Sequence, residues 1–191
     1  MDTLISPRLV LGPLWGHSAF RLLAAHGRGH EWRWLRAIVL AEFDYRCAAC
    51  SHRQRRWMVC DEGWQYDPDV PVAVLLALRL LCPRCDAVCH VGHTGVSRGP
   101  QAYDRAISHM ARVNGTSIRD ALEMVDREWQ RWRELSAIVG WRVRVAADLA
   151  ARFPALSIVE RDDLDSAATS RGTPRTINRG AAQVHVLPEH P

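Results

Sequence analysis

The stretches that decide the fold are Cys47-Ala-Ala-Cys50 and Cys82-Pro-Arg-Cys85, two C-x-x-C pairs with 31 residues between them. A tight C-x-x-C turn directs two thiolates toward one point, and two such turns supply the four sulfurs of a tetrahedral zinc site. We therefore expect Cys47, Cys50, Cys82 and Cys85 to hold one structural Zn²⁺. A site closed by four protein ligands has no open coordination position, so any chemistry must lie beside it.

The composition is that of a folded chain of ordinary domain size. The 191 residues are 48% hydrophobic, which is enough for a core. The longest apolar run, 70–81, contains Pro71 and Arg79 and is shorter than the roughly 18 residues of a membrane span. We expect no signal peptide and no membrane partner. Paired C-x-x-C spacing without an export signal indicates reduced thiolates, and hence a cytoplasmic protein.

The basic side chains other than histidine are all arginine. The chain has 25 such residues, none of them lysine, and a formal net charge of +4. Guanidinium groups bind phosphates in bidentate geometry. This charge is compatible with a nucleic-acid partner, and it is equally compatible with a solvated basic surface.

Periodicity and chain breaks divide the sequence into four expected segments. These are an N-terminal helical segment (1–45), a zinc-centred core (46–98), C-terminal helices with a short strand (99–146), and a helical extension with a disordered tail (147–191). The spacing predicts a helix over 31–43, and Ser117-Ile-Arg-Asp120 is a capping-box pattern that opens another. From Arg161 the chain has no periodicity, which favours disorder.

Two segments precede the second cysteine pair. Residues 57–60 predict a strand, and residues 72–81 form an apolar run that leads directly into Cys82. The pattern of 72–81 does not distinguish a helix from a strand. Cys60 and Cys89 lie outside the two C-x-x-C pairs, and we expect both to be buried core thiols.

Acidic and imidazole side chains gather beside the expected zinc site. Asp61 and Glu62 follow the strand predicted over 57–60, while Asp86 and His90 are four residues apart after the second pair and share one helix face. If Asp61 approaches them from the strand end, the three can hold Mg²⁺, Mn²⁺ or a softer transition metal. Alternatively, Asp86 caps its helix, and Asp61 and Glu62 are solvated loop charges.

Together these motifs resemble the zinc-ribbon branch of the HNH (ββα-metal) endonuclease superfamily, in particular a group of small bacterial and phage HNH proteins. The resemblance covers roughly residues 8–145. The matching stretches are Cys60-Asp-Glu-Gly-Trp-Gln-Tyr-Asp67, Leu81-Cys-Pro-Arg-Cys-Asp-Ala-Val-Cys-His90, Arg98-Gly99, His109 with Asn114-Gly115, and Trp132, Ser136 and Trp141. The resemblance implies an α+β fold in which a treble-clef or ββα-metal zinc ribbon is flanked by helices. It also implies divalent-metal-dependent cleavage of DNA.

The chain departs from that family pattern at two of three site positions. Asp61 stands where the family has a histidine after the strand cysteine, Asp86 stands where it has a histidine after the last zinc cysteine, and only His90 is kept. The resemblance implies Asp61, Asp86 and His90 as ligands of a catalytic Mg²⁺ or Mn²⁺. The usual histidine base is missing. Glu62 or a water molecule on the ion would have to replace it, and Glu62 is a poor base at its ordinary pKa of about 4.3 unless burial raises it.

Three functions follow from this pattern. The first is an HNH-type DNA endonuclease with a diverged active site, whose catalytic candidates are Asp61, Glu62 and His90. The second is a catalytically inactive HNH-like zinc-ribbon module that binds nucleic acid or a protein partner. The third is a structural component of a phage or mobile-element machine, in which the zinc ribbon acts only as a staple.

Overall fold

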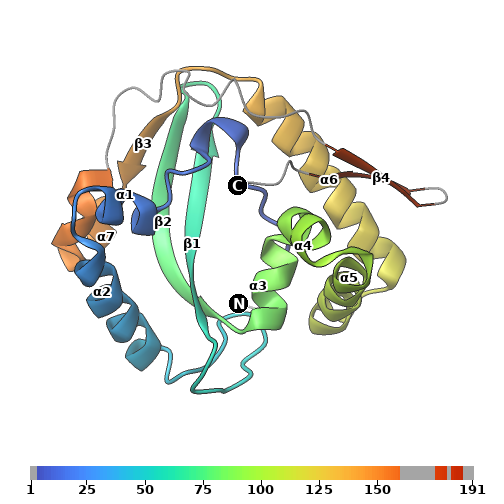
Figure 1. Cartoon of the computed structure of the whole chain (residues 1–191), viewed down its shortest axis with the longest axis horizontal. Helices are drawn as coiled ribbons and strands as arrows, with labels where there is room; N and C mark the ends of the chain where they lie inside the picture. Colours follow the sequence, from blue (N-terminus) through green and yellow to red (C-terminus); the bar gives the residue numbers. More distant parts are fainter. Residues whose placement is uncertain (1–3, 160–174, 180–181, 187–191) are drawn as a thin grey trace. The chain divides into compact units, whose positions relative to one another are not determined.

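The structure, a computed structural model shown in Figure 1, describes residues 4–159, 175–179 and 182–186. These residues form an α+β fold, as predicted. The chain divides into two compact units that interleave along the sequence. We call them the sheet unit (10–82 and 134–159 among the described residues) and the helical unit (4–9, 83–133, 175–179 and 182–186).

A three-stranded sheet forms the centre of the sheet unit. β1 (Val59–Asp67) pairs antiparallel with β2 (Val72–Leu81), and β3 (Arg142–Val145) lies parallel to the other edge of β2. The apolar run 72–81, whose pattern fits both a helix and a strand, is therefore a strand. In the β1–β2 register, Asp61 lies opposite Arg79, and this pairing matters for the site described below.

Helices pack beside this sheet. They are α1 (Ala19–Ala25), α2 (Gly29–Glu42) and α7 (Ala147–Arg152), with 3₁₀ turns at Gly12–Leu14 and Pro154–Val159 (Figure 1). The helix predicted over 31–43 is confirmed as α2. Its inward stripe includes Leu35 and Val39, which are buried. These side chains share the core with fully buried Leu75, Trp141 and Phe153.

The helical unit is built from α3 (Pro83–Cys89), α4 (Val91–Arg98), α5 (Pro100–Asn114) and α6 (Ile118–Ser136), of which α6 belongs to this unit as far as Arg133. α5 ends at Asn114 and is capped by Gly115, whose φ of 65° is the left-handed conformation that glycine adopts without strain. The predicted capping box opens α6. The Asp120 amide donates to Ser117 Oγ at 3.1 Å, and the Ser117 amide donates to Asp120 Oδ2 at 3.0 Å.

The C-terminal segment differs in part from the expectation of disorder after Arg161. β4 (Arg175–Arg179) and β5 (Ala182–Val186) form an antiparallel hairpin. The rest of the expected tail, 161–174, 180–181 and 187–191, lies outside the described residues. Among the described helices, none combines the length and the apolar character that a lipid bilayer requires.

We expect Trp141→Ala to lower the free energy of unfolding by about 3–5 kcal/mol, because the change leaves a large cavity in the core. The Trp141 side chain has no exposed surface, its Nε1 donates to the Leu135 carbonyl at 3.2 Å, and it packs edge-on against Tyr66. Urea denaturation measures the loss. Trp34 on α2 is 57% exposed, so Trp34→Ala is the matched control and should change stability by less than about 1 kcal/mol. Equal losses in the two variants would contradict the burial assigned to Trp141.

Candidate metal centres

The backbone after α2 folds into the first cysteine knuckle. The Cys47 amide donates to the His52 carbonyl at 2.9 Å, and the Ser51 amide donates to the Cys47 carbonyl at 2.9 Å. The Ala48 amide donates to the Leu80 carbonyl at 2.8 Å. The knuckle is therefore fixed to the end of β2, which is the strand that leads into Cys82.

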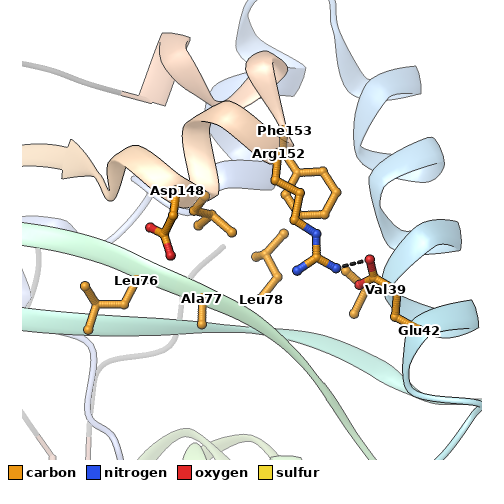
Figure 2. Close-up of a pocket in the computed structure, with 9 residues that line it drawn as sticks. Val39, Glu42, Leu76, Ala77, Leu78, Asp148, Arg152 and Phe153 are labelled. Atoms are coloured by element: carbon orange, nitrogen blue, oxygen red, sulfur yellow. Dashed lines mark ion pairs between the residues drawn. The ribbon is translucent and has the colours of Figure 1, made fainter.

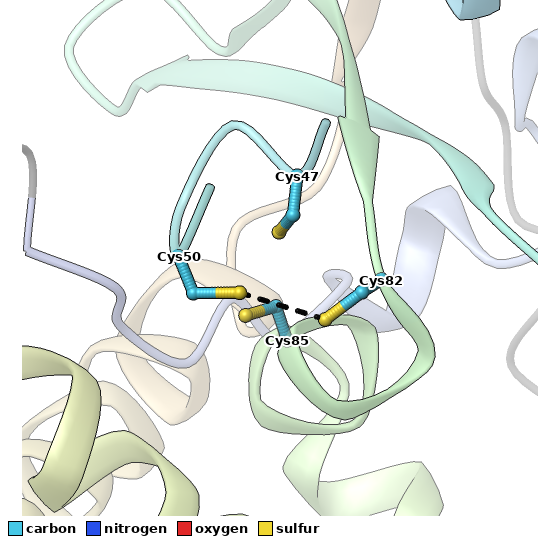
Figure 3. A group of neighbouring side chains, drawn as sticks. All are labelled: Cys47, Cys50, Cys82 and Cys85. Atoms are coloured by element: carbon cyan, nitrogen blue, oxygen red, sulfur yellow. Dashed lines mark hydrogen bonds between the residues drawn. The ribbon is translucent and has the colours of Figure 1, made fainter. Parts of the chain in front are cut away.

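Figure 3 shows the four cysteines of the C-x-x-C pairs directed toward one point, and their sulfurs all lie within 4.8 Å of one another. Cys47, Cys50 and Cys82 belong to the sheet unit, and Cys85 follows only three residues later on the first turn of α3. The Cys50 and Cys82 sulfurs are 3.7 Å apart. This distance is too long for a disulfide, and it is close to the separation of about 3.8 Å that Zn–S bonds of about 2.3 Å give in a tetrahedron.

The donor set thus fits a metal such as zinc. None of the four cysteines forms a disulfide bond, and Cys47, Cys82 and Cys85 are almost fully buried. Uncompensated thiolates are costly to bury, whereas thiolates bound to a divalent ion are stable there. The predicted clustering of the four cysteines is confirmed, and the identity of the ion stays a prediction.

His109 contacts this centre, a role that the sequence did not reveal. Its Nε2 lies 3.2 Å from Cys85 Sγ, and its Nδ1 lies 3.5 Å from a guanidinium nitrogen of Arg112. With a thiolate at Cys85, Nε2 carries the proton and donates to the sulfur, which leaves Nδ1 to accept from Arg112. Such outer hydrogen bonds orient a metal ligand and tune its basicity.

The second group consists of Asp61, Asp86 and His90. A carboxylate oxygen of each aspartate and a ring nitrogen of His90 lie within 4.8 Å of one another. Asp86 Oδ1 and His90 Nε2 are 3.7 Å apart, as the four-residue spacing at the end of α3 predicts. Asp61 is 6% exposed, while Asp86 and His90 are half-buried. Two carboxylates and an imidazole suit Mn²⁺ or Mg²⁺, and also softer ions.

Arg79 is a partner of this group that sequence reasoning treated only as a break in an apolar run. It forms an ion pair with Asp61 directly across the β1–β2 ladder. A carboxylate this buried requires a counter-charge, and the guanidinium supplies one. Arg79 Nε is itself buried and has no hydrogen-bond partner within the described part of the chain. Any cation bound at Asp61 would have to share the carboxylate with Arg79.

Glu62 has the pKa of a general base, but it lies on the face of β1 opposite to Asp61. Burial raises the pKa of Glu62 to about 7, although its hydrogen bonds stabilise the carboxylate and partly oppose this rise. One oxygen accepts from the Ala19 amide at 2.9 Å, at the start of α1, and the other accepts from Trp64 Nε1 at 3.1 Å. Consecutive strand residues point to opposite faces of a sheet. The structure therefore does not bring Glu62 into the group with Asp61, and its catalytic role stays a prediction.

Cys60 and Cys89 are buried, as expected, and neither belongs to the cluster of four. Burial, together with the charges of Glu62 and Asp61, raises the pKa of Cys60 to about 12. A thiol with that pKa is neither a nucleophile nor a ready metal ligand at neutral pH. Both cysteines act as small apolar core residues.

A separate hollow in the sheet unit lies between α2, β2 and α7 (Figure 2). Its volume is about 220 Å³, which is below the range of about 300–1,000 Å³ typical of ligand pockets. Figure 2 shows the Arg152 guanidinium directed at the Glu42 carboxylate, with which it forms an ion pair. Glu42 and Asp148 are the carboxylates that line it, and no group of three metal-ligating side chains is found there among the described residues.

Comparison of the chain with protein-family models, curated proteins and solved structures finds no match. The expected relation to HNH endonucleases therefore depends on the motifs and on the geometry of the two groups alone.

We expect purified protein to contain one equivalent of zinc, because four thiolates close a tetrahedral site. Cys82→Ser should lose this zinc and unfold at a lower temperature, since metal binding contributes directly to folding. Elemental analysis and thermal denaturation measure both effects. Cys60→Ala is the control and should keep its zinc in spite of a smaller core. Full zinc occupancy in Cys82→Ser would exclude the four-cysteine centre.

We expect His109→Phe to weaken zinc binding by about 10–100-fold, because it removes the hydrogen bond to Cys85 Sγ. Competition with a chromophoric chelator gives the affinity. His109→Gln, which keeps an N–H donor, should recover part of the loss, and Ser108→Ala, on the exposed side of α5, should cause none. An unchanged zinc affinity in His109→Phe would show that the ring only packs.

Proposed function

We propose that the chain is a divalent-metal-dependent DNA endonuclease of the HNH type with a diverged active site. In this proposal the four cysteines hold a structural zinc ion in a ribbon of the treble-clef or ββα-metal kind, and β1, β2 and α3 supply the ββα order. The observation that carries the proposal is the grouping of Asp61, Asp86 and His90. Asp86 directly follows Cys85, the last cysteine of the cluster, and His90 lies four residues further on.

The chain's own residues would divide the work as follows. Asp86 lies on α3 and His90 directly follows it, with the His90 amide donating to the Asp86 carbonyl at 2.9 Å. Asp61 is held in place by Arg79 on the neighbouring strand. A bound divalent ion would neutralise charge on the scissile phosphate and acidify water. Arg79, already beside Asp61, would place a positive charge next to that phosphate. Because no histidine occupies position 61, we expect a slow enzyme with an alkaline optimum.

A second candidate is a non-catalytic zinc-ribbon module that binds nucleic acid or a protein. The observation that favours it is the Asp61–Arg79 ion pair. If Arg79 retains Asp61, only Asp86 and His90 remain for an ion, and two ligands hold Mg²⁺ or Mn²⁺ weakly. In that case the zinc cluster would keep its structural role and cleavage would be absent.

Nicking of supercoiled plasmid separates the two candidates. We expect slow nicking with Mg²⁺, Mn²⁺ or Ni²⁺, and a loss of at least about 100-fold in His90→Ala and Asp86→Asn, because each removes a ligand of the ion. The matched control is His93→Ala. His93 is exposed on α4, outside the group, so this variant should nick at the normal rate.

The outcomes are distinct. DNA binding without nicking in any of these metals would favour the module over the enzyme. Nicking that persists at full rate in both His90→Ala and Asp86→Asn would show that Asp86 and His90 are not part of the active site. Zinc content and circular dichroism confirm that each variant is folded.

A further inference from the structure

A groove of about 590 Å³ lies within the helical unit, between α3, α4 and α5. Four arginines line it, and only one carboxylate, Asp104, accompanies them. The arginines, all exposed, are Arg84, Arg98, Arg105 and Arg112. A concave wall with this excess of guanidinium groups has a positive potential that attracts anions.

Among the described residues, no carboxylate lies within ion-pair distance of these four arginines. On the neighbouring helix α6, by contrast, two arginines form ion pairs: Arg119 with Glu123 at 3.1 Å and Arg131 with Glu128 at 3.5 Å. In the groove, the Arg112 guanidinium contacts His109, which is not a carboxylate. The guanidinium groups that line the groove therefore have no acidic partner among the described residues.

Helix dipoles do not explain the arrangement. Arg98 and Arg112 lie in the last turns of α4 and α5, where a cation is favoured. Arg84, however, lies in the first turn of α3, where a cation is unfavourable, and Arg105 lies in the middle of α5. An external anion would compensate both of these positions.

The spacing of the arginines suits an extended ligand. Arg98, at the end of α4, is followed at intervals of seven residues by Arg105 and Arg112 on α5, which are two helical turns apart. On α5 that interval places Arg105 and Arg112 about 10 Å apart along the axis. A row of this length matches a chain of phosphates better than one phosphate, which would need the guanidinium groups to converge on a point.

We propose that this groove binds the phosphodiester backbone of a nucleic acid, with Arg84, Arg98, Arg105 and Arg112 each donating to phosphate oxygens. The proposal rests on the nucleic-acid function proposed above, but it holds whether or not the protein cleaves. Because backbone contacts carry no base information, binding through the groove should depend on salt and little on sequence.

The test is binding of a fluorescent DNA duplex, followed by anisotropy over a range of salt concentrations without added divalent ion. We expect the double variant Arg84→Gln, Arg105→Gln to bind about tenfold or more weakly at low salt. Its slope of log K against log salt should be shallower by about 2, since each lost phosphate contact removes about 1. Arg127→Gln with Arg119→Gln on α6 is the control with equal loss of charge, and it should bind nearly as the parent protein does.

Three results would overturn the proposal. They are equal losses in the groove and control variants, no binding of the duplex by the parent protein at low salt, and preferential binding of an acidic peptide in competition with the duplex. His90→Ala should bind the duplex normally. Failure of cleavage with intact, groove-dependent binding would therefore reject the nuclease and leave the groove assignment standing.

Discussion

The rest of the structure depends on one constraint, which is that four cysteine sulfurs converge to within 4.8 Å of one another. The first knuckle meets this constraint by bonding its Ala48 amide to the Leu80 carbonyl at the end of β2. The second meets it by leaving β2 and entering α3 within four residues. Asp86 follows Cys85 directly, and Asp61 follows Cys60 on the adjacent strand. Asp86 is thus positioned by the same turn of α3 that positions Cys85.

The parts of this arrangement that could be predicted from sequence are those written in short spacings. The C-x-x-C pairs, the capping box at Ser117 and the Asp86–His90 interval each lie within a few residues. The parts that could not be predicted depend on pairings between distant residues. The contact of His109 with Cys85 spans 24 positions, and that of Arg79 with Asp61 spans 18. The hydrogen bond from the Ala19 amide to Glu62 is a third such pairing, because it depends on which face of β1 packs against α1.

The ion pair between Asp61 and Arg79 explains how an aspartate can occupy a buried strand position. A neutral histidine, which the resembled family has there, needs no counter-charge, whereas a buried carboxylate does. The two residues are therefore interdependent, because replacing either one leaves the other as a buried charge without a counter-charge. Because its carboxylate already has a cationic partner, Asp61 is a weaker candidate to bind a metal ion than an unpaired carboxylate would be. The ion pair is therefore the main physical argument for a binding module rather than an enzyme.

The His109 ring joins two features that would otherwise be independent. One of its nitrogens contacts a cysteine of the metal centre, and the other contacts Arg112 in the basic groove. An anion that drew the guanidinium toward itself would weaken the contact of Arg112 with Nδ1, and so alter the electron density on the Cys85 sulfur. By thermodynamic reciprocity, filling the metal centre would change the affinity of the groove by the same factor. In that case one imidazole would couple metal binding at the cysteines to anion binding in the groove.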